Sequence, residues 1–175
     1  NILLPARLLY EKGIEEFVKA SKLLKQKKVK GNFYLSGDAL TVNPSKIKLE
    51  VIETWVNEGL IIYRGYNSDI KKMYKDIDIV CLPSWREGFP KVLMEAASLG
   101  LPIITTNVPG CRDAVIKNKT AILVPVKDEV ELAKAIKKLF EDVQLRDKMG
   151  RSNRELAIKK FDLKLILPKI IKLYN

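Results

Sequence analysis

The 175-residue sequence has no histidine, two cysteines and few aromatic residues, which make up 7% of the chain. The absence of histidine excludes a histidine general base and a histidine metal ligand within these residues. No apolar stretch approaches the roughly 20 residues that a membrane-spanning helix needs. The cysteines, Cys81 and Cys111, lack the CxxC spacing of a zinc site. We interpret both as buried small residues of a reducing compartment, although Cys111 follows a Pro-Gly pair near a predicted helix start, where a thiol can be activated.

Basic residues outnumber acidic ones, 32 to 21, and give a formal charge of +11. This excess favours anionic partners such as a nucleotide, a nucleic acid or an anionic membrane. Lysines on the polar faces of predicted helices, such as Lys19, Lys22 and Lys134, account for the same excess without any partner. A hydrophobic content of 47% supports one domain with a sizeable core. The chain opens on Asn1 and an apolar run, so we expect it to be a piece of a longer protein.

Short apolar runs alternate with segments of helical periodicity along the chain. Strands are predicted at residues 2–4, 32–37 (strand then turn), 60–63, 78–82, 103–105 and 121–124, with helices between them. This alternation predicts an α/β fold, a Rossmann-like doubly wound parallel sheet of about six strands over residues 1–160. Residues 161–175 are predicted to form a basic amphipathic tail helix, interrupted by Pro168. Ligands of such sheets bind at the carboxyl ends of the strands, so the loops that follow the strands are the informative ones.

Two carboxylates flank the most informative loop. Glu87 lies in the loop after the apolar strand 78–82, and Glu95 lies on the helix predicted over residues 91–99. Free backbone N–H groups near Gly88, Phe89 and Lys91, together with the helix dipole, form an anion site. Pro90 is acceptable at such a helix start. A phosphate cradle with a hydroxyl-binding carboxylate on each side suits a nucleotide-sugar, whereas a solvated Glu95 paired with Lys91 is the plain alternative.

The first loop, after residues 2–4, adds two cations. Arg7 offers a fork of donors that matches phosphate oxygens, and Lys12 offers a point charge. Gly13 allows close backbone approach at the start of the next helix. An Arg and a Lys at this spacing are common by chance, so the loop by itself is a weak signal. Glu95 is predicted to point to the ligand edge, away from a core stripe of Val92, Ala96 and Leu99.

Taken together, the motifs resemble the carboxyl-terminal, donor-binding half of a GT-B-fold retaining glycosyltransferase of family four. The resemblance covers nearly the whole chain in the family's order. Two positions depart from the family pattern, because Ala6 and Ala39 stand where glycines are usual. The matching segments are 6–8, 12–13, 37–38, 64–66, 78, 83–84, 87–90, 95–96, 100–104 and 109–110.

The resemblance implies a role for each site residue. Glu87 would contact the donated sugar, and Glu95 would hold the nucleotide ribose. Arg7 and Lys12 would bind the diphosphate, and they count with Glu87 as catalytic. Backbone groups near Arg64 and Tyr66 would take the base. The remaining donor-binding residues line the sugar–phosphate pocket, and they are Gly88, Phe89, Pro90 and Lys91.

The resemblance also implies the partners. The donor is a nucleotide-sugar, UDP-linked by preference, and an amino-terminal acceptor domain is expected outside this chain. Residues 105–112 are similar to enzymes that extend polyprenyl-diphosphate-linked sugars for surface polysaccharide, which points to a cytoplasmic protein and leaves open peripheral association with the membrane. The DxD at Asp76 and Asp78 matches a metal motif of another glycosyltransferase fold. We expect no metal and no other cofactor, since Arg7, Lys12 and a helix dipole can stabilise the leaving diphosphate.

Three alternatives stay open. The same fold serves nucleotide-sugar epimerases and phosphorylases, although an epimerase would need further acid–base groups and histidine is absent. A non-catalytic basic module could bind nucleic acid, but the sequence carries no recognition motif for RNA or DNA. A degenerate regulatory half that binds nothing is the third alternative.

Overall fold

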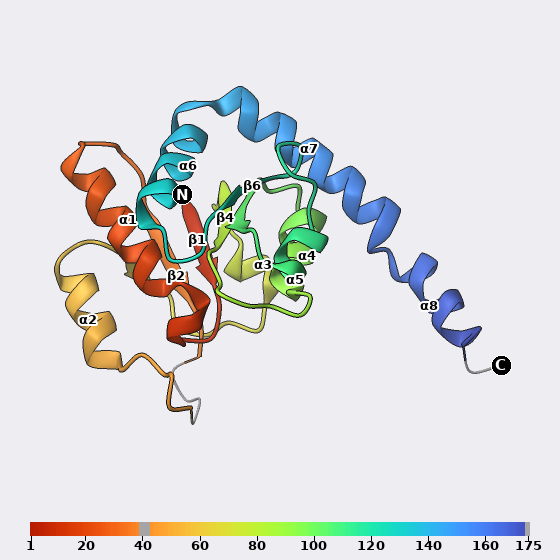
Figure 1. Cartoon of the computed structure of the whole chain (residues 1–175), viewed down its shortest axis with the longest axis horizontal. Helices are drawn as coiled ribbons and strands as arrows, with labels where there is room; N and C mark the ends of the chain where they lie inside the picture. The colour runs from red at the N-terminus through yellow and green to blue at the C-terminus, as the bar shows by residue number, and fades with distance from the viewer. Residues whose placement is uncertain (39–42, 174–175) are drawn as a thin grey trace.

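The central sheet of the computed structural model, which describes residues 1–38 and 43–173, has six strands in the order β3-β2-β1-β4-β5-β6 (Figure 1). Every pairing between neighbouring strands is parallel. This order confirms the predicted α/β, Rossmann-like sheet. The strands are β1 Ile2–Pro5, β2 Phe33–Ser36, β3 Ile62–Tyr63, β4 Ile79–Leu82, β5 Ile103–Thr106 and β6 Ala121–Val124.

Helices cover both faces of the sheet, as the doubly wound prediction requires (Figure 1). Alternate residues of β1 face opposite sides of the sheet, because Ile2 and Leu4 belong to one apolar cluster and Leu3 belongs to the other. Burial on both faces explains why the strands read as continuous apolar runs. The helices are α1 Ile14–Gln26, α2 Leu49–Asn57, α3 Ile70–Met73, α4 Lys91–Ser98, α5 Pro109–Asp113, α6 Glu129–Glu141, α7 Val143–Lys160 and α8 Leu163–Ile171, with a short 3₁₀ helix, η1 Tyr10–Lys12, before α1.

Local sequence signals set several helix ends. The Asp69 carboxylate accepts hydrogen bonds from the backbone N–H groups of Lys71 and Lys72 and so caps α3. Gly100 has a φ of +69° just after α4, which is the left-handed conformation that ends many helices. The third strand is shorter than predicted, since the residues that precede Ile62 are buried without belonging to the strand.

The predicted core stripe of α4 is partly wrong. Leu93, Ala96 and Ala97 are buried, whereas Leu99 is 44% exposed. Leu99 is the C-cap of this short helix, so the chain turns away there before the side chain can reach the core. Glu95 nevertheless lies off the buried stripe, as expected.

The carboxyl-terminal helices extend to one side of the sheet. Helix α7 packs against α4 and α6, and α8 continues beyond it, away from the sheet (Figure 1). Helix α8 covers much of the segment predicted as a tail and contains Pro168. Its leucines at positions 163, 165 and 167 are exposed. Within the described residues, no helix combines the length and the apolar character needed to cross a membrane.

Candidate active site

The candidate site lies at the carboxyl ends of β1 and β4, the two central strands. The chain runs from β1 outward to β3, then returns to β4 and runs outward to β6, so the connections leave β1 and β4 in opposite directions. Such a switch point opens a crevice at the carboxyl edge of the sheet. Arg7 and Lys12 follow β1, whereas Glu87 follows β4. The topology therefore brings the first loop beside the loop that carries Glu87.

An ion pair joins these two loops. The Lys12 ammonium lies 2.6 Å from Glu87 Oε1, and the exposed fractions of the two side chains are 15% and 13%. Hydrogen bonds tie the backbones together as well, because the Trp85 N–H and the Ser84 hydroxyl both donate to the Glu11 carbonyl, at 2.8 and 2.9 Å. Lys12 and Glu87 were predicted at one site with different partners, the diphosphate and the sugar. In the structure, each neutralises the charge of the other.

Two glycines allow the loops to pack this closely. A Cβ on Gly13, which has a φ of +73°, would lie 2.1 Å from the Pro83 carbonyl oxygen. A Cβ on Gly110 would lie 2.0 Å from the carbonyl oxygen of Gly88 and 2.4 Å from that of Glu87. Neither contact leaves room for a side chain. Gly13 was predicted as a close-approach glycine, whereas Gly110 was matched to the family pattern without a packing role and supports the Glu87 loop from behind.

The second carboxylate has a neutral partner. The Tyr74 hydroxyl donates to Glu95 Oε2 at 3.1 Å. Burial raises the pKa of Tyr74 above its ordinary value, and the charge and hydrogen bond of Glu95 raise it further. Tyr74 therefore stays protonated and acts as a fixed donor. No sequence motif marked this tyrosine, which follows α3 directly and is buried beside α4.

Glu95 and Arg7 line a common cavity of about 310 Å³ at this edge of the sheet. Tyr66, which is 71% exposed, lies at the same cavity. The volume of this cavity is at the lower end of the range for small-molecule sites. Lys12 and Glu87 lie outside its walls, so the predicted residues fall into two neighbouring groups. The other lining residues are Pro5, Ala6, Ser36, Gly37, Asp38, Asn67, Ser68, Ile70, Met73 and Val92.

Arg64 is already engaged. Its guanidinium carbon lies 3.7 Å from the centroid of the Tyr34 ring, and one nitrogen donates to the Lys75 carbonyl at 3.3 Å. The cation–π contact and the hydrogen bond direct this side chain away from the cavity that Tyr66 lines. The backbone beside it is hydrogen-bonded as well, because the Gly65 carbonyl accepts from the Gly37 N–H at 3.0 Å and from the Ser36 hydroxyl at 2.8 Å.

Helix α4 starts at Lys91, as predicted. Pro90 is the N-cap residue and is buried, while Lys91 is the first helical residue and is exposed. Gly88 is exposed, with open space where a Cβ would project. Phe89 is 47% exposed, and its ring lies 5.9 Å from the ring of Phe161 at the end of α7. The helix start therefore faces solvent beside the ion pair.

The remaining residues that the sequence singled out pack as structural residues or lie at the other edge of the sheet. Asp76 and Asp78 precede β4, at the amino edge of the sheet. Cys81 and Cys111 are free and buried, and burial raises the pKa of both thiols, which confirms their interpretation as structural residues. Gly37 passes so close to the Ala6 carbonyl that a Cβ would lie 1.8 Å from its oxygen, while Ala39 falls outside the described residues.

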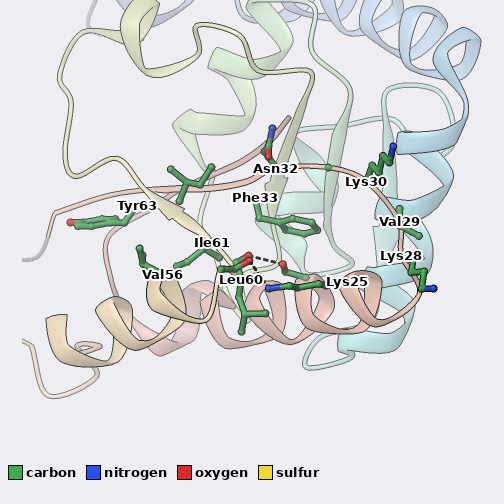
Figure 2. A pocket seen from close by; sticks show the side chains of 14 residues that line it. Lys25, Lys28, Val29, Lys30, Asn32, Phe33, Val56, Leu60, Ile61 and Tyr63 are labelled. Carbon is green, nitrogen blue, oxygen red and sulfur yellow. Dashed lines mark hydrogen bonds between the residues drawn. The ribbon is translucent and has the colours of Figure 1, made fainter.

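A larger cavity, about 640 Å³, opens at the opposite edge of the sheet, where β2 and β3 begin (Figure 2). Lys25, Lys28 and Lys30 lie around it, with Phe33 and Leu60 among the apolar residues. The Lys25 ammonium donates to the Glu58 carbonyl at 2.8 Å, just after α2 ends, so it serves the end of this helix. The predicted site residues all lie at the other edge.

Comparison with known proteins identifies the family. Residues 1–156 match the family described as glycosyl transferases group 1. The chain is 33% identical over 174 residues to the N,N'-diacetylbacillosaminyl-diphospho-undecaprenol alpha-1,3-N-acetylgalactosaminyltransferase of Campylobacter jejuni, covering 99% of this chain and 44% of that protein. The chain therefore spans less than half the length of this curated relative.

Two solved structures show the same fold. The crystal structure of Anabaena HepE (Alr3699) in complex with UDP-glucose has a TM-score of 0.87 at 24% identity, over 99% of this chain and 48% of that one. A crystallised C-terminal domain of a group 1 glycosyl transferase (LpcC) from Francisella tularensis has a TM-score of 0.79 at 25% identity, over 93% of this chain and 86% of that one. The chain belongs to the group 1 glycosyl transferase family and corresponds to the carboxyl-terminal half of its GT-B enzymes.

Proposed function

We propose that this chain is the donor-binding domain of a retaining glycosyltransferase that moves a sugar from a UDP-sugar to an acceptor hydroxyl. One observation carries the proposal: a cavity lined by Arg7 and Glu95 opens at the sheet's switch point, next to the loops that the Lys12–Glu87 pair joins. An anion-binding side chain and a hydroxyl-binding carboxylate on one cavity suit a nucleotide. The neighbouring ion pair supplies a second cation and a second carboxylate for the diphosphate and the sugar.

In the proposed complex, the nucleoside occupies the cavity of about 310 Å³. Glu95, held by Tyr74, accepts hydrogen bonds from the ribose hydroxyls. The base lies near Tyr66 and the backbone after β3. The diphosphate lies between Arg7, Lys12 and the start of α4, where backbone N–H groups favour an anion. The sugar then lies at the Glu87 loop, near Gly88 and Phe89.

Donor binding would make Lys12 and Glu87 exchange partners. A diphosphate offers Lys12 more negative charge than one carboxylate does, so it draws the ammonium away from Glu87. Glu87 is then free to accept hydrogen bonds from the sugar or to face the charge that develops at its ring. The departing diphosphate keeps Arg7, Lys12 and the helix dipole, so these groups can do the work of a metal ion. The acceptor attacks on the face that the diphosphate leaves, which retains configuration.

The relatives suggest the substrates. HepE is crystallised with UDP-glucose, which supports a UDP-sugar donor. The name of the Campylobacter relative specifies a sugar acceptor on diphospho-undecaprenol, which supports a polyprenyl-diphosphate-linked glycan as acceptor. An enzyme with these substrates works in the cytoplasm at the inner face of the membrane. The acceptor cleft needs an amino-terminal domain, so we expect the 175-residue chain by itself to bind UDP without transferring sugar.

The test uses the longer protein that contains this chain. It is screened against UDP-, GDP- and ADP-sugars with a polyprenyl-diphosphate-linked acceptor, with and without inorganic phosphate, and the products are separated by a chromatography that resolves epimers and are then identified by mass. A glycoside formed from a UDP-sugar is the expected result. An epimerised nucleotide-sugar, or a sugar phosphate formed with inorganic phosphate, would instead establish one of the other reactions of this fold.

Binding by the 175-residue chain tests the remaining alternatives. Calorimetry with UDP should give saturable binding at one site, and its absence would favour a degenerate half. A mobility shift with a salt series exposes nucleic-acid binding, because phosphate-dominated binding weakens steeply with salt. Tight, salt-sensitive binding of nucleic acid without UDP binding would replace the proposal by the basic-module alternative.

A further inference from the structure

Trp85 lies on the same loop as Glu87 and is held from three directions. Its backbone N–H donates to the Glu11 carbonyl at 2.8 Å. Its indole N–H donates to Glu16 Oε1 at 3.0 Å. The ammonium of Lys127, which follows β6, lies 4.0 Å from the centroid of its ring. Segments after β1, β4 and β6 therefore meet on this one side chain.

Glu16 is an unusual partner for an indole. The residue is 6% exposed, on the first turn of α1, and its Oε2 atom has no hydrogen-bond partner among the described residues. A buried carboxylate that uses only part of its hydrogen-bonding capacity costs stability. Such an exception to the rules of core packing is typical of residues that serve function. The contact of Glu16 with Trp85 is therefore expected to do more than stabilise the fold.

The Glu16–Trp85 hydrogen bond links the same two segments as the Lys12–Glu87 ion pair. Both connect the segment at the start of α1 to the loop after β4. Of the two, only the ion pair contains a group that the donor diphosphate would bind, the Lys12 ammonium. When Lys12 turns to a phosphate, Glu87 loses its partner. The bonds that remain between the two segments are those from the Trp85 N–H and the Ser84 hydroxyl to the Glu11 carbonyl, and the Glu16–Trp85 bond, which joins two side chains.

We infer that Glu16 and Trp85 are positioning residues for Glu87, which keep the Glu87 loop against α1 after the donor's diphosphate has withdrawn Lys12. The inference rests on the proposed function. Neither residue touches the substrate. Their role is to let the ion pair open without releasing the backbone that carries Glu87, so that its carboxylate meets the sugar in a fixed position.

Hydrogen exchange of the amides at residues 84–88, measured with and without saturating UDP, tests the inference in the 175-residue chain. A domain of this kind folds alone, as the Francisella structure shows. In the wild type, we expect that UDP does not increase the exchange rate of these amides. In Glu16→Ala and Trp85→Phe, exchange should stay near the wild-type rate without UDP and rise at least tenfold with UDP. Trp85→Phe removes the N–H donor while keeping an aromatic ring under Lys127.

Glu16→Gln is the matched control, because its amide oxygen can still accept from the indole. It should restore the wild-type response to UDP. Affinity provides a second readout. In the Ala and Phe variants, UDP should bind within about twofold of the wild type, while UDP-glucose and UDP-N-acetylgalactosamine lose about tenfold, the effect expected for one hydrogen bond to a charged group.

Three outcomes are decisive. If wild type and variants respond equally to UDP, the inference is wrong while the proposed function stands. Fast exchange of the loop in the variants without UDP would make the bond merely structural and would also overturn the inference. If the wild-type chain binds no UDP, the proposed function fails and the inference fails with it. Should Glu16→Ala not fold, Trp85→Phe and Glu16→Gln decide alone.

Discussion

Glu87 and Glu95 are the same residue type on one edge of one sheet, yet their surroundings differ. Glu87 is paired with a cation at 2.6 Å, and 13% of its side chain is exposed. Glu95 accepts a hydrogen bond from the neutral phenol of Tyr74 and lines an open cavity. Under the proposed function, the nucleoside end is preformed, whereas the sugar end must exchange one partner for another before it can act.

The exchange is energetically reasonable. An exposed ion pair contributes about 0–1 kcal/mol, whereas hydrogen bonds to charged groups contribute about 1.5–3 kcal/mol. The Lys12 and Glu87 side chains are 15% and 13% exposed, so water screens their attraction less than that of an exposed pair, while their desolvation offsets part of the gain. A doubly charged diphosphate can compensate for its loss. The proposed function therefore couples nucleotide binding to release of Glu87, whereas it lets Glu95 take part in binding without rearrangement.

The largest expected effect is on the nucleoside end. Glu95→Ala should weaken UDP binding by about 100-fold or more, because two charge-assisted hydrogen bonds to the ribose are lost. Tyr74→Phe removes one donor to Glu95 and leaves the carboxylate, so it should cost only a few-fold. Titration calorimetry of the three proteins measures both. Equal UDP affinity of wild type and Glu95→Ala would remove the ribose assignment and with it half of the comparison.

Next comes the support behind the sugar end. Gly110→Ala places a Cβ against the backbone of Glu87 and Gly88, so the free energy of unfolding should fall by about 1–3 kcal/mol through overpacking. Gly88→Ala, where the Cβ meets open space, should change the same quantity by less than about 0.5 kcal/mol. Urea unfolding of both variants provides the measurement. Similar changes in the free energy of unfolding for the two variants would mean that the loop shifts at little cost and that Gly110 does not fix the position of Glu87.

The ion pair itself should give a smaller effect. Lys12→Ala and Glu87→Ala should each lower the free energy of unfolding by about 1–2 kcal/mol, since each leaves a poorly exposed charge unpaired. The double variant should lose less than the sum of the two, by about 1 kcal/mol. The variants separate in binding, because Lys12→Ala weakens UDP whereas Glu87→Ala weakens the intact UDP-sugar more than UDP. Additive stabilities would show that the pair is not coupled in solution.

The smallest effect concerns the thiol behind the sugar end. Burial raises the pKa of Cys111, and the charge of nearby Glu87 raises it further, while hydrogen bonds from Thr105 and Thr106 and the charge of Lys12 lower it. A raised pKa leaves less thiolate at neutral pH, and burial blocks reagents. Alkylation of Cys81 and Cys111 by iodoacetamide should therefore be at least tenfold slower in the native chain than in urea. Rapid native labelling of Cys111 would indicate that the Glu87 loop opens on its own.

The fold followed from sequence because each strand is a short apolar run bounded by turn residues. Strand ends were less certain, as at residues 60–63, where apolar character marks burial but pairing depends on the neighbouring strand. Glu87, Glu95, Arg7 and Lys12 were placed at the correct edge, since parallel strands bring their carboxyl ends together.

Side-chain partners were the part that sequence could not supply. Glu95 was weighed against a pairing with Lys91, yet its partner is Tyr74, which is distant in sequence. Lys12 was assigned to a phosphate, and without one it pairs with Glu87. Gly110 and Glu16 act through contacts with a loop that lies on another strand. Each of these contacts depends on the packing of segments that no local pattern connects.

A crystal structure of the chain with UDP tests the central claim most directly. We predict that the diphosphate lies within hydrogen-bonding distance of Arg7 and Lys12 at the start of α4, that the ribose contacts Glu95, and that Lys12 has left Glu87. UDP bound in the lysine-rimmed cavity at the amino edge of the sheet (Figure 2), with the Lys12–Glu87 pair intact, would contradict the account.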